Sequence, residues 1–281
     1  MNNNGLDSLI EEELIEAEKK RQTNRKSVVR MYSIFLSLAA IVVLVILIGG
    51  FALQLLLLPF FIALIPVAIG LYLKMNLVKR IKDQVLHPIL KKLRPNLSYF
   101  SEGYITESQF EESNLFTRPD RYKGEDLLSG KSNKTTFSFS EIHAEEKRTS
   151  SSNGKSKTTY STIFKGIFMI ADFNKHIKNE TYVLTSGGKY WSKFKRVKVE
   201  DPIFEKRFDV YSDNQIEARY ILTPSMMSRI VKLEERFNCQ LFLSFRGNHV
   251  NIALGSSVNY FEPDVSKEIT REAVEKIIKE M

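Results

Sequence analysis

The longest apolar segment of the sequence runs from Met31 to Leu73 and contains no charged side chain. A single helix of that length would measure about 65 Å, whereas the hydrocarbon core of a bilayer is about 30 Å thick. Gly49 and Gly50 lie near the middle, where a turn would divide the segment. The pattern therefore predicts a transmembrane helical hairpin over residues 31–73, with two antiparallel spans.

Basic residues flank both outer ends of this segment, and none lies within it. They are Lys19, Lys20, Arg21, Arg25, Lys26 and Arg30 before it, and Lys74, Lys79, Arg80 and Lys82 after it. Because cytoplasmic flanks carry an excess of Lys and Arg, this distribution predicts that both termini are cytoplasmic and that the hairpin lies in a bacterial inner membrane.

Helical periodicity appears on both sides of the hairpin. Residues 1–30 predict a cytoplasmic amphipathic arm, either a solvated helix or a docking helix for a partner protein or for the chain's own domain. Residues 74–95 predict a helical stalk, with apolar positions at i, i+4 steps, that ends at Pro95. The remaining residues, 96–281, predict one cytoplasmic domain.

In that domain the hydrophobic period changes to two near Thr135, which is typical of strands. Residues 147–159 are rich in Ser, Lys, Thr, Asn and Gly and predict a long mobile hairpin loop. Arg246-Gly247-Asn248 predicts the turn of a last hairpin. The expected strands are 135–143, 160–173, 181–185, 194–199, 208–211, 217–222, 240–245 and 250–254.

Two helices are expected to cover the sheet. Thr223 followed by Pro224 is a helix start, with apolar positions continuing to about Arg236. Residues 264–279 predict a closing helix whose Ile269 packs inward. The predicted fold class is α+β, with a mostly antiparallel sheet under two helices, and a pleckstrin-like roll would fit this strand run.

Composition narrows the functional classes. The net charge of +8 favours anionic lipid as a partner of a membrane-anchored chain. Cys239 is the only cysteine, so no intramolecular disulfide can form, which fits a reducing cytoplasm. The first apolar run begins only at Met31 and is too long for a secretion signal.

Several short strings, taken in order along the chain, carry a family resemblance. They are Gly124-Glu-Asp-Leu-Leu-Ser-Gly130, Phe139-Ser-Glu-Ile-His-Ala-Glu145, Phe164-Lys-Gly-Ile-Phe168, Ala171-Asp-Phe-Asn-Lys175, Phe208-Asp-Val-Tyr-Ser-Asp-Asn-Gln215 and Ala218-Arg-Tyr-Ile-Leu-Thr-Pro224. Together with the apolar hairpin, they resemble the bacterial membrane family "domain of unknown function 3137" over about residues 30–262. The resemblance implies a bacterial, membrane-anchored protein and supplies no catalytic residue.

A segment of alternating basic and aromatic residues is the first candidate binding site. We call it the basic-aromatic segment; its candidate residues are Lys189, Tyr190, Trp191, Lys193, Phe194, Lys195, Arg196 and Lys198. Aromatic rings and cationic side chains together favour the interface of an anionic bilayer. The same composition could bind single-stranded nucleic acid through stacking and phosphate contacts. It could also be an ordinary exposed strand whose aromatic side chains pack inward. Tethering beside a bilayer favours lipid over nucleic acid.

A metal site is the second candidate. Glu141, His143 and Glu145 alternate along one predicted strand and would share a face, so they could offer three ligands. Asp172, Asn174 and His176 do the same near the end of the next strand, and a polar strand face in water is the favoured interpretation of either set. No motif predicts a bound cofactor or a nucleophile.

These observations leave three functions open. The favoured one is a non-enzymatic, membrane-anchored cytoplasmic binding or scaffold protein that contacts anionic lipid head groups. The second is a membrane-associated, metal-dependent enzyme that uses Glu141, His143 and Glu145. The third is a component of a bacterial envelope assembly that docks a protein partner through the N-terminal arm. The lipid bilayer is the expected partner, and no small-molecule substrate is indicated.

Overall fold

The computed structural model spans residues 1–281 and describes all of them except 1–2, 50–56, 153–154, 187–193, 271 and 273–281. The chain divides into two compact units. One contains residues Met1–Leu93 and Tyr260–Met281, and the other contains Arg94–Asn259. We call them the helical unit and the sheet domain.

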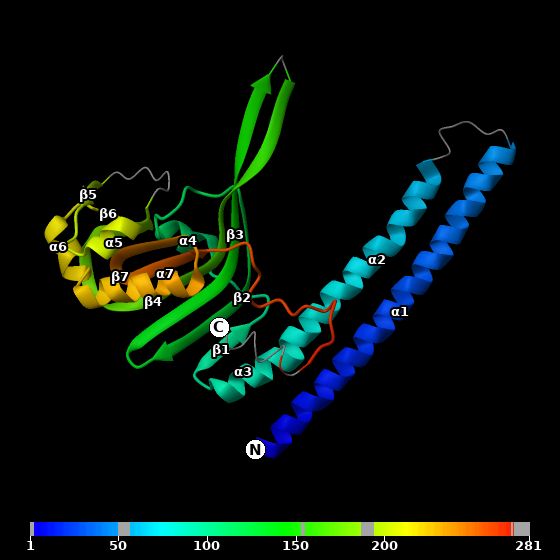
Figure 1. The fold of residues 1–281 in the computed structure, drawn as a ribbon, viewed down its shortest axis with the longest axis horizontal. Helices are drawn as coiled ribbons and strands as arrows, with labels where there is room; N and C mark the ends of the chain where they lie inside the picture. The colour runs from blue at the N-terminus through cyan, green and yellow to red at the C-terminus, as the bar shows by residue number, and fades with distance from the viewer. Residues whose placement is uncertain (1–2, 50–56, 153–154, 187–193, 271, 273–281) are drawn as a thin grey trace. The chain divides into compact units, whose positions relative to one another are not determined.

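The helical unit is built from two long helices and a short continuation. Helix α1 (Asn3–Gly49) and helix α2 (Leu57–Ile81) run side by side in opposite directions (Figure 1). The chain then continues through a π-helical turn (Lys82–Leu86) into α3 (His87–Leu93), which ends before Pro95. The predicted arm and the predicted first span are thus parts of one uninterrupted helix.

Complementary contacts hold α1 against α2 near the basic residues that flank the apolar segment. Leu14 and Ala17 of α1 are buried, as is Leu77 of α2. The Arg80 guanidinium lies 2.5 Å from a carboxylate oxygen of Glu16. The described apolar positions Leu14 and Ala17 of the predicted arm are therefore covered within the helical unit itself.

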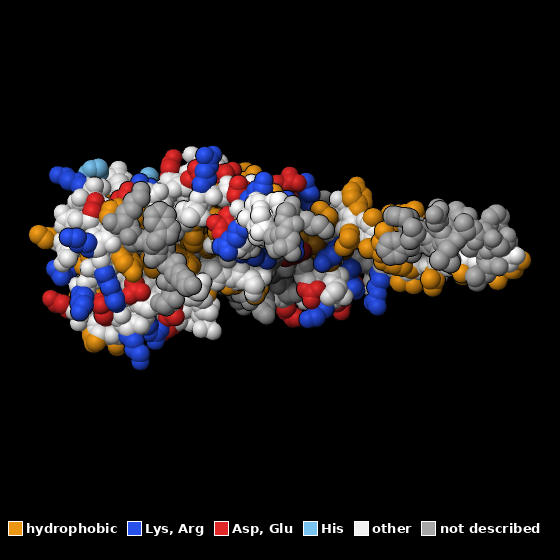
Figure 2. All heavy atoms as spheres, turned by 90° about the horizontal axis from the view of Figure 1, so that it is seen from above, with side chains coloured by type: hydrophobic (Ala, Val, Ile, Leu, Met, Phe, Trp, Pro, Cys, Tyr) orange, Lys and Arg blue, Asp and Glu red, His pale blue; other side chains and the backbone are white. Residues whose placement is uncertain are grey.

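Further along, the same two helices carry an exposed apolar surface, seen in orange in Figure 2. Leu36 remains 70% exposed and Ile48 79% exposed. Among the described residues, one helical stretch, Glu11–Val45, is long and apolar enough to cross a membrane, and its most apolar part is not buried. The exposed large apolar residues of this surface are Ile34, Leu36, Leu38, Ile41, Leu44, Val45 and Ile48 of α1, and Leu64, Ile65, Val67, Leu71, Tyr72 and Met75 of α2.

The described C-terminal residues belong to the helical unit, whereas the sequence analysis placed them in the cytoplasmic domain. The predicted helix over 264–279 is wrong for residues 264–270, which form turns and irregular backbone; the rest lies outside the described residues, apart from Glu272. Asp264 accepts hydrogen bonds from the backbone and hydroxyl of Ser266, and such local bonds compete with helix formation. Ile269 is buried, and its N–H donates to Glu18 Oε2 of α1 at 3.1 Å.

The sheet domain confirms the large antiparallel sheet and therefore a mixed α and β architecture. The sheet order is β1-β2-β3-β4-β6-β5, and β7 also pairs with β4. Every strand pair is antiparallel, and this topology does not confirm a pleckstrin-like roll. The strands are β1 (Leu97–Phe100), β2 (Arg121–Ser132), β3 (Thr135–Ser152), β4 (Lys155–Thr185), β5 (Lys195–Val197), β6 (Phe208–Ser212) and β7 (Leu241–Gly255).

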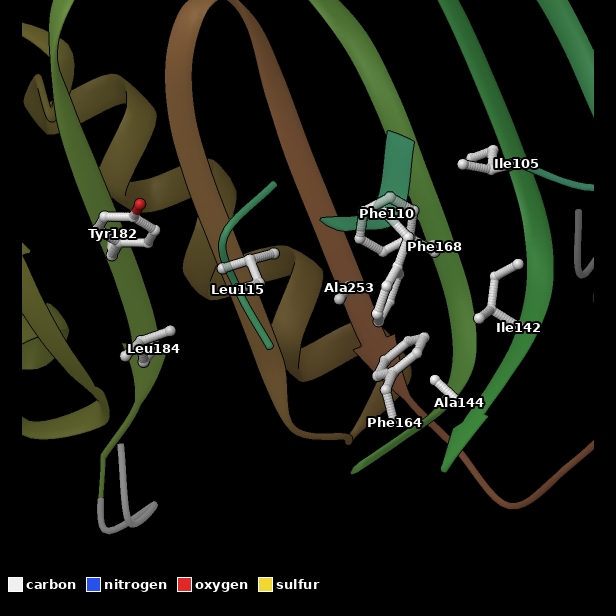
Figure 3. Close-up of a cluster of buried hydrophobic side chains, with 10 residues drawn as sticks. All are labelled: Ile105, Phe110, Leu115, Ile142, Ala144, Phe164, Phe168, Tyr182, Leu184 and Ala253. Atoms are coloured by element: carbon white, nitrogen blue, oxygen red, sulfur yellow. The ribbon is translucent and has the colours of Figure 1, made fainter. Parts of the chain in front are cut away.

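Strand β7 folds back on itself and fits between two arms of the long strand β4 (Figure 3). The Gly255 N–H donates to the Gln240 carbonyl at 2.8 Å, and Asn251 Nδ2 donates to Ser244 Oγ at 3.0 Å. Gly247 lies at the fold-back with a φ of 55°. The predicted turn at residues 246–248 is therefore present.

Strands β3 and β4 extend well beyond the rest of the sheet as a two-stranded arm (Figure 1). The predicted hairpin is present, but the long loop predicted over 147–159 is wrong, because its described residues pair in register from Lys147↔Tyr160 to Ser152↔Lys155. Polar Ser and Thr side chains tolerate strands whose two faces are both in water, so composition alone did not reveal that the strands continue this far.

Four short helices join the strands: α4 (Glu107–Glu112), α5 (Pro202–Arg207), α6 (Gln215–Ile221) and α7 (Pro224–Phe237). Helix α7 begins as predicted, with Thr223 Oγ1 accepting from the Met226 N–H. The predicted strand over 217–222 is wrong, since those residues mostly form α6. Asn214 Oδ1 accepts from the first backbone N–H groups of α6 and so favours a helix there.

The core of the sheet domain lies between the sheet and α4 and is rich in aromatic side chains (Figure 3). Phe110 of α4 is 1% exposed, and its ring lies 5.0 Å from that of Phe168 and 5.3 Å from that of Phe116. Such ring pairs add specific packing to the area that they bury. This core fixes the central strands β2, β3 and β4, on which the candidate site lies.

Candidate functional site

A hollow of about 350 Å³ lies over β2, β3 and β4. Strand register places Lys123 opposite His143, and His143 opposite Lys165, so three nitrogen-bearing side chains form one row across the sheet. Glu125 lies opposite Glu141 in a neighbouring row. We call this the sheet hollow; it is also lined by Gly124, Ile142, Gly166, Val258 and Asn259.

Three carboxylates converge at one side of this hollow. Glu125, Asp126 and Glu141 each place an oxygen within 4.8 Å of the others. Asp126 is 1% exposed and Glu141 9% exposed, while Glu125 is open to solvent. Like charges that face each other across strands repel and destabilise the fold unless they are neutralised. This carboxylate cluster therefore needs such neutralisation.

A β-bulge in β2 creates the cluster. The pairing of β2 with β3 shifts between Glu125 and Leu128, and Asp126 has a φ of 59°. This left-handed backbone is one that Asp tolerates better than most residues. It turns the Asp126 side chain inward, where the Tyr99 hydroxyl donates to Asp126 Oδ1 at 2.5 Å.

The chemistry of the cluster is that of oxygen ligands alone. Carboxylate oxygens suit hard cations such as Ca²⁺ and Mg²⁺, whereas zinc sites in proteins usually contain His or Cys. Asp126 Oδ1 accepts from the Tyr99 hydroxyl, and one oxygen of each of the three acids lies within 4.8 Å of the others. This geometry could hold one hard cation, and it offers no nucleophile.

The predicted ligands Glu141, His143 and Glu145 are not brought together as a set. Glu141 joins the carboxylate cluster. His143 Nε2 lies 3.1 Å from Thr162 Oγ1 and 3.8 Å from Glu145 Oε1. The pairing of β3 with β4 shifts between Ala144 and Glu145, so simple alternation fails at that point.

Sequence reasoning missed Glu125 and Asp126 as partners of Glu141. Residues 121–132 were not predicted as a strand, and without β2 no register could place these acids beside β3. The available signal was the pair of adjacent acids after Gly124, followed by the apolar pair Leu127-Leu128. That pattern does not by itself specify a bulge, so the side chain that faces Glu141 could not be identified from it.

The second predicted set, Asp172, Asn174 and His176, fastens neighbouring strands and does not converge. The hydroxyl and N–H of Thr136 donate to Asp172 and lower the pKa of its carboxyl. Asn174 Nδ2 donates to Thr135 Oγ1 at 2.7 Å, and His176 Nδ1 lies 3.0 Å from Asn248 Oδ1. These residues tie β4 to β3 and β7.

Half of the basic-aromatic segment, namely Lys189, Tyr190, Trp191 and Lys193, lies outside the described residues. Of the other half, Phe194 stacks on Tyr182 with ring centroids 5.5 Å apart, at the edge of the core. Arg196 pairs with Asp209 at 2.8 Å and with Glu205 at 3.2 Å. Lys195 and Lys198 are exposed.

Cys239 shows no sign of activation. It lies just beyond α7, and burial raises the pKa of its thiol, as does the negative charge of Glu234. A thiol with a raised pKa is a poor nucleophile at neutral pH. Cys239 is half-buried, and a free cysteine in such a place behaves as a small apolar side chain.

With the fold and these geometries described, the chain can be compared with known proteins. A family model described as "protein of unknown function (DUF3137)" matches residues 162–281, which confirms the resemblance over that part of the chain. No curated protein matches. The crystal structure of the mycobacterial trehalose monomycolate transport factor A, TtfA, is similar at a TM-score of 0.39 with 12% sequence identity, over 69% of this chain and 93% of that one. Similarity at this level assigns no function.

Proposed function

We propose that this chain is a membrane-anchored cytoplasmic binding or scaffold protein. The observation that supports this most strongly is the exposed apolar surface of α1 and α2. Monomeric soluble proteins rarely expose contiguous apolar patches larger than a few hundred Å². The two packed helices expose large aliphatic side chains, among them Leu36 and Ile48. Lipid acyl chains are a favourable environment for such side chains, whereas water is not.

The proposed anchor is a transmembrane hairpin made by the apolar parts of α1 and α2. The antiparallel pairing of these helices supports it, because both then enter from the same side of the membrane. The basic residues that flank residues 31–73 put that side in the cytoplasm of a bacterial cell, with both termini there. Pro66 within α2 is tolerated in membrane helices.

The sheet domain would be the binding module that the anchor holds at the membrane. The exposed Lys195 and Lys198 support contact of the basic-aromatic segment with anionic lipid. Phe194 stacks on Tyr182 and Arg196 pairs with Asp209, so both side chains already have partners within the domain. Tyr190 and Trp191 are therefore the aromatic residues proposed to enter the lipid interface. A protein partner docking through the N-terminal arm would meet its acidic face, since Leu14 and Ala17 are covered.

The alternative function, a metal-dependent enzyme, is favoured by one observation, the carboxylate cluster. On this alternative the ligands would be Glu125, Asp126 and Glu141, and neither His143 nor Glu145 would bind the ion. Elemental analysis of the purified full chain tests it. Stoichiometric Mg, Ca or Mn that is lost in a Glu125→Gln, Glu141→Gln variant would establish the metal site, and its absence would leave the cluster a structural feature.

Alkaline extraction of membranes tests the proposed anchor. The full chain should stay in the membrane pellet, because a helical hairpin resists extraction that strips peripheral proteins. Replacing Leu36, Ile41 and Leu44 by Lys should release it, since each Lys costs about 3 kcal/mol at a span centre. The matched control replaces the exposed Ile203, Ile216 and Val258 of the sheet domain by Lys and should leave the chain in the pellet. Release of the unmodified chain would contradict the proposal.

A further inference from the structure

A cationic groove lies along α1, on the turns that directly precede its apolar part. It is a hollow of about 700 Å³, and we define it by the residues that give it its chemistry. They are Gln22, Arg25, Lys26, Val29, Arg30 and Ser33. Their spacing of three and four residues places them along one side of the helix.

The cations of this groove are not neutralised by the surrounding described residues. Arg21, which also lines the hollow, is committed to Glu18, with Arg21 Nη2 2.6 Å from Glu18 Oε1, and it also feels the negative charge of Glu268. Arg25, Lys26 and Arg30 are exposed, and none of the described residues forms an ion pair with them. Beyond Glu18 helix α1 contains no acidic residue, and the neighbouring helix α2 contains none at all.

The position of the groove along α1 matches the depth of lipid phosphates. Arg30 directly precedes Met31, where the uncharged part of the chain begins. At about 1.5 Å per residue, Arg25 lies only about 9 Å before Met31 along the helix. Val29 is 61% exposed between the cations and offers an apolar contact for the upper part of an acyl chain.

We propose that this groove binds the head group of an anionic phospholipid of the cytoplasmic leaflet. Arg25 and Arg30 would each hold phosphate oxygens through two N–H groups, and Lys26 would add a compact charge. The inference deepens the proposed function and rests on its membrane insertion of α1. It differs from contact through the basic-aromatic segment, because these cations lie on the anchor itself and not on the sheet domain.

The test measures lipid binding to the full chain in a neutral detergent by native mass spectrometry. Phosphatidylglycerol, an anionic probe, should be retained in preference to phosphatidylcholine. Each surface cation contributes about fivefold, so an Arg25→Gln, Lys26→Gln, Arg30→Gln variant should lose phosphatidylglycerol affinity by about a hundredfold. The preference should also weaken as salt rises, because the head-group attraction is screened.

Two further variants make the result specific. A variant with Lys157, Lys178 and Lys232 replaced by Gln loses the same charge from the sheet domain and should bind as the unmodified chain does. An Arg25→Lys, Arg30→Lys variant keeps the charge and should keep most of the preference. Circular dichroism should show unchanged helix content in all three.

Three results would overturn the proposal. They are equal retention of both lipids, an unchanged affinity in the triple groove variant, and displacement of phosphatidylglycerol by equimolar inorganic phosphate, which would point to a site for free phosphate. Alkaline extraction of the same triple variant separates this proposal from the anchor. A variant that stays in the membrane pellet but loses the lipid preference supports both, whereas a variant that stays in the pellet and keeps the preference contradicts the groove alone, and release of the unmodified chain contradicts the anchor on which the groove proposal rests.

Discussion

At the scale of single residues, Gly166 shows how closely the central strands approach one another. Its φ is 145°, and a Cβ atom built there would lie 2.0 Å from the Leu254 carbonyl oxygen. Gly166 lies beside the sheet hollow and marks the place where β7 crosses close to β4. Only glycine readily adopts this positive φ and also has no side chain that would clash with the neighbouring strand.

Replacing Gly166 by Ala should therefore destabilise the chain by about 2–5 kcal/mol, because it adds backbone strain to a clash with another strand. The matched control is Gly247→Ala, where φ is 55° and a Cβ would meet no atom within 4 Å. That change should cost about 1 kcal/mol, for the left-handed backbone alone. Urea unfolding of both full-length variants in neutral detergent measures the difference, and equal costs would contradict the close approach.

The candidate site shows what single residues can and cannot reveal. Glu141 was identified from its alternation with His143, but its true neighbours depend on a bulge at Asp126 that no periodicity predicts. A single inserted residue changes which side chains share a face. Arg196 likewise looked free in the sequence, yet it is held by Asp209 on the neighbouring strand β6.

At the scale of elements, the described C-terminal residues are fastened to α1 through Glu18. The Arg21 side chain lowers the pKa of the Glu18 carboxyl most, with further help from Gln22 and the Ile269 N–H, from the usual 4.5 to about 2. A carboxyl with a depressed pKa stabilises the folded state above its unfolded pKa. That stability is lost as pH falls towards the folded pKa.

The contact between Ile269 and Glu18 should therefore hold at neutral pH and loosen between about pH 4.5 and pH 2. Hydrogen exchange at the Ile269 amide, corrected for its intrinsic rate, should show protection that falls through this range. Glu18→Gln should remove the pH dependence. The Val265 amide, which donates to the Pro263 carbonyl, provides a control that should not follow it. Protection of Ile269 that does not change with pH would contradict the fastening.

The arm of β3 and β4 is an element that should contribute little to stability. From the pair Arg148↔Thr159 outward, its described residues pair only with each other, and those whose side chains are described are exposed. Tyr160, over whose ring Arg121 lies at 3.3 Å, is the last residue before this part with a contact to β2.

Replacing residues 149–158 by Asn-Gly joins Arg148 to Thr159 through a two-residue turn suited to hairpins. Since no core contact is removed, the free energy of unfolding should change by less than about 1 kcal/mol. The same replacement made two pairs deeper would remove Tyr160 and should cost more. A large loss from the shorter deletion would show that the arm has a structural role.

Elements with an apolar pattern were predicted well, and those without one were not. The apolar run of β4, the turn at Gly247 and the start of α7 at Thr223 all follow from local chemistry visible in the sequence. The arm failed because its strands have no buried face, so the period-two signal is absent. The strand predicted over 217–222 failed because the cap at Asn214 was overlooked.

At the scale of the whole molecule, the two compact units carry different features. The helical unit carries the exposed apolar surface and the cationic groove, and the sheet domain carries the hollow and its carboxylate cluster. The long apolar helix was visible in the sequence because residues 31–73 contain no charged side chain. The sequence could not predict that the C-terminal residues return to the helices, since that contact joins Glu18 to Ile269 across almost the entire chain.

The central claim is that the apolar parts of α1 and α2 cross a membrane twice, with both termini in the cytoplasm. Paired fusions to a fluorescent protein, active in the cytoplasm, and to alkaline phosphatase, active outside it, test this most directly in bacterial cells. Fusions after residue 281 should fluoresce and lack phosphatase activity, and fusions after residue 52 should show the reverse. Phosphatase activity after residue 281, or fluorescence at both positions, would contradict the two-span anchor.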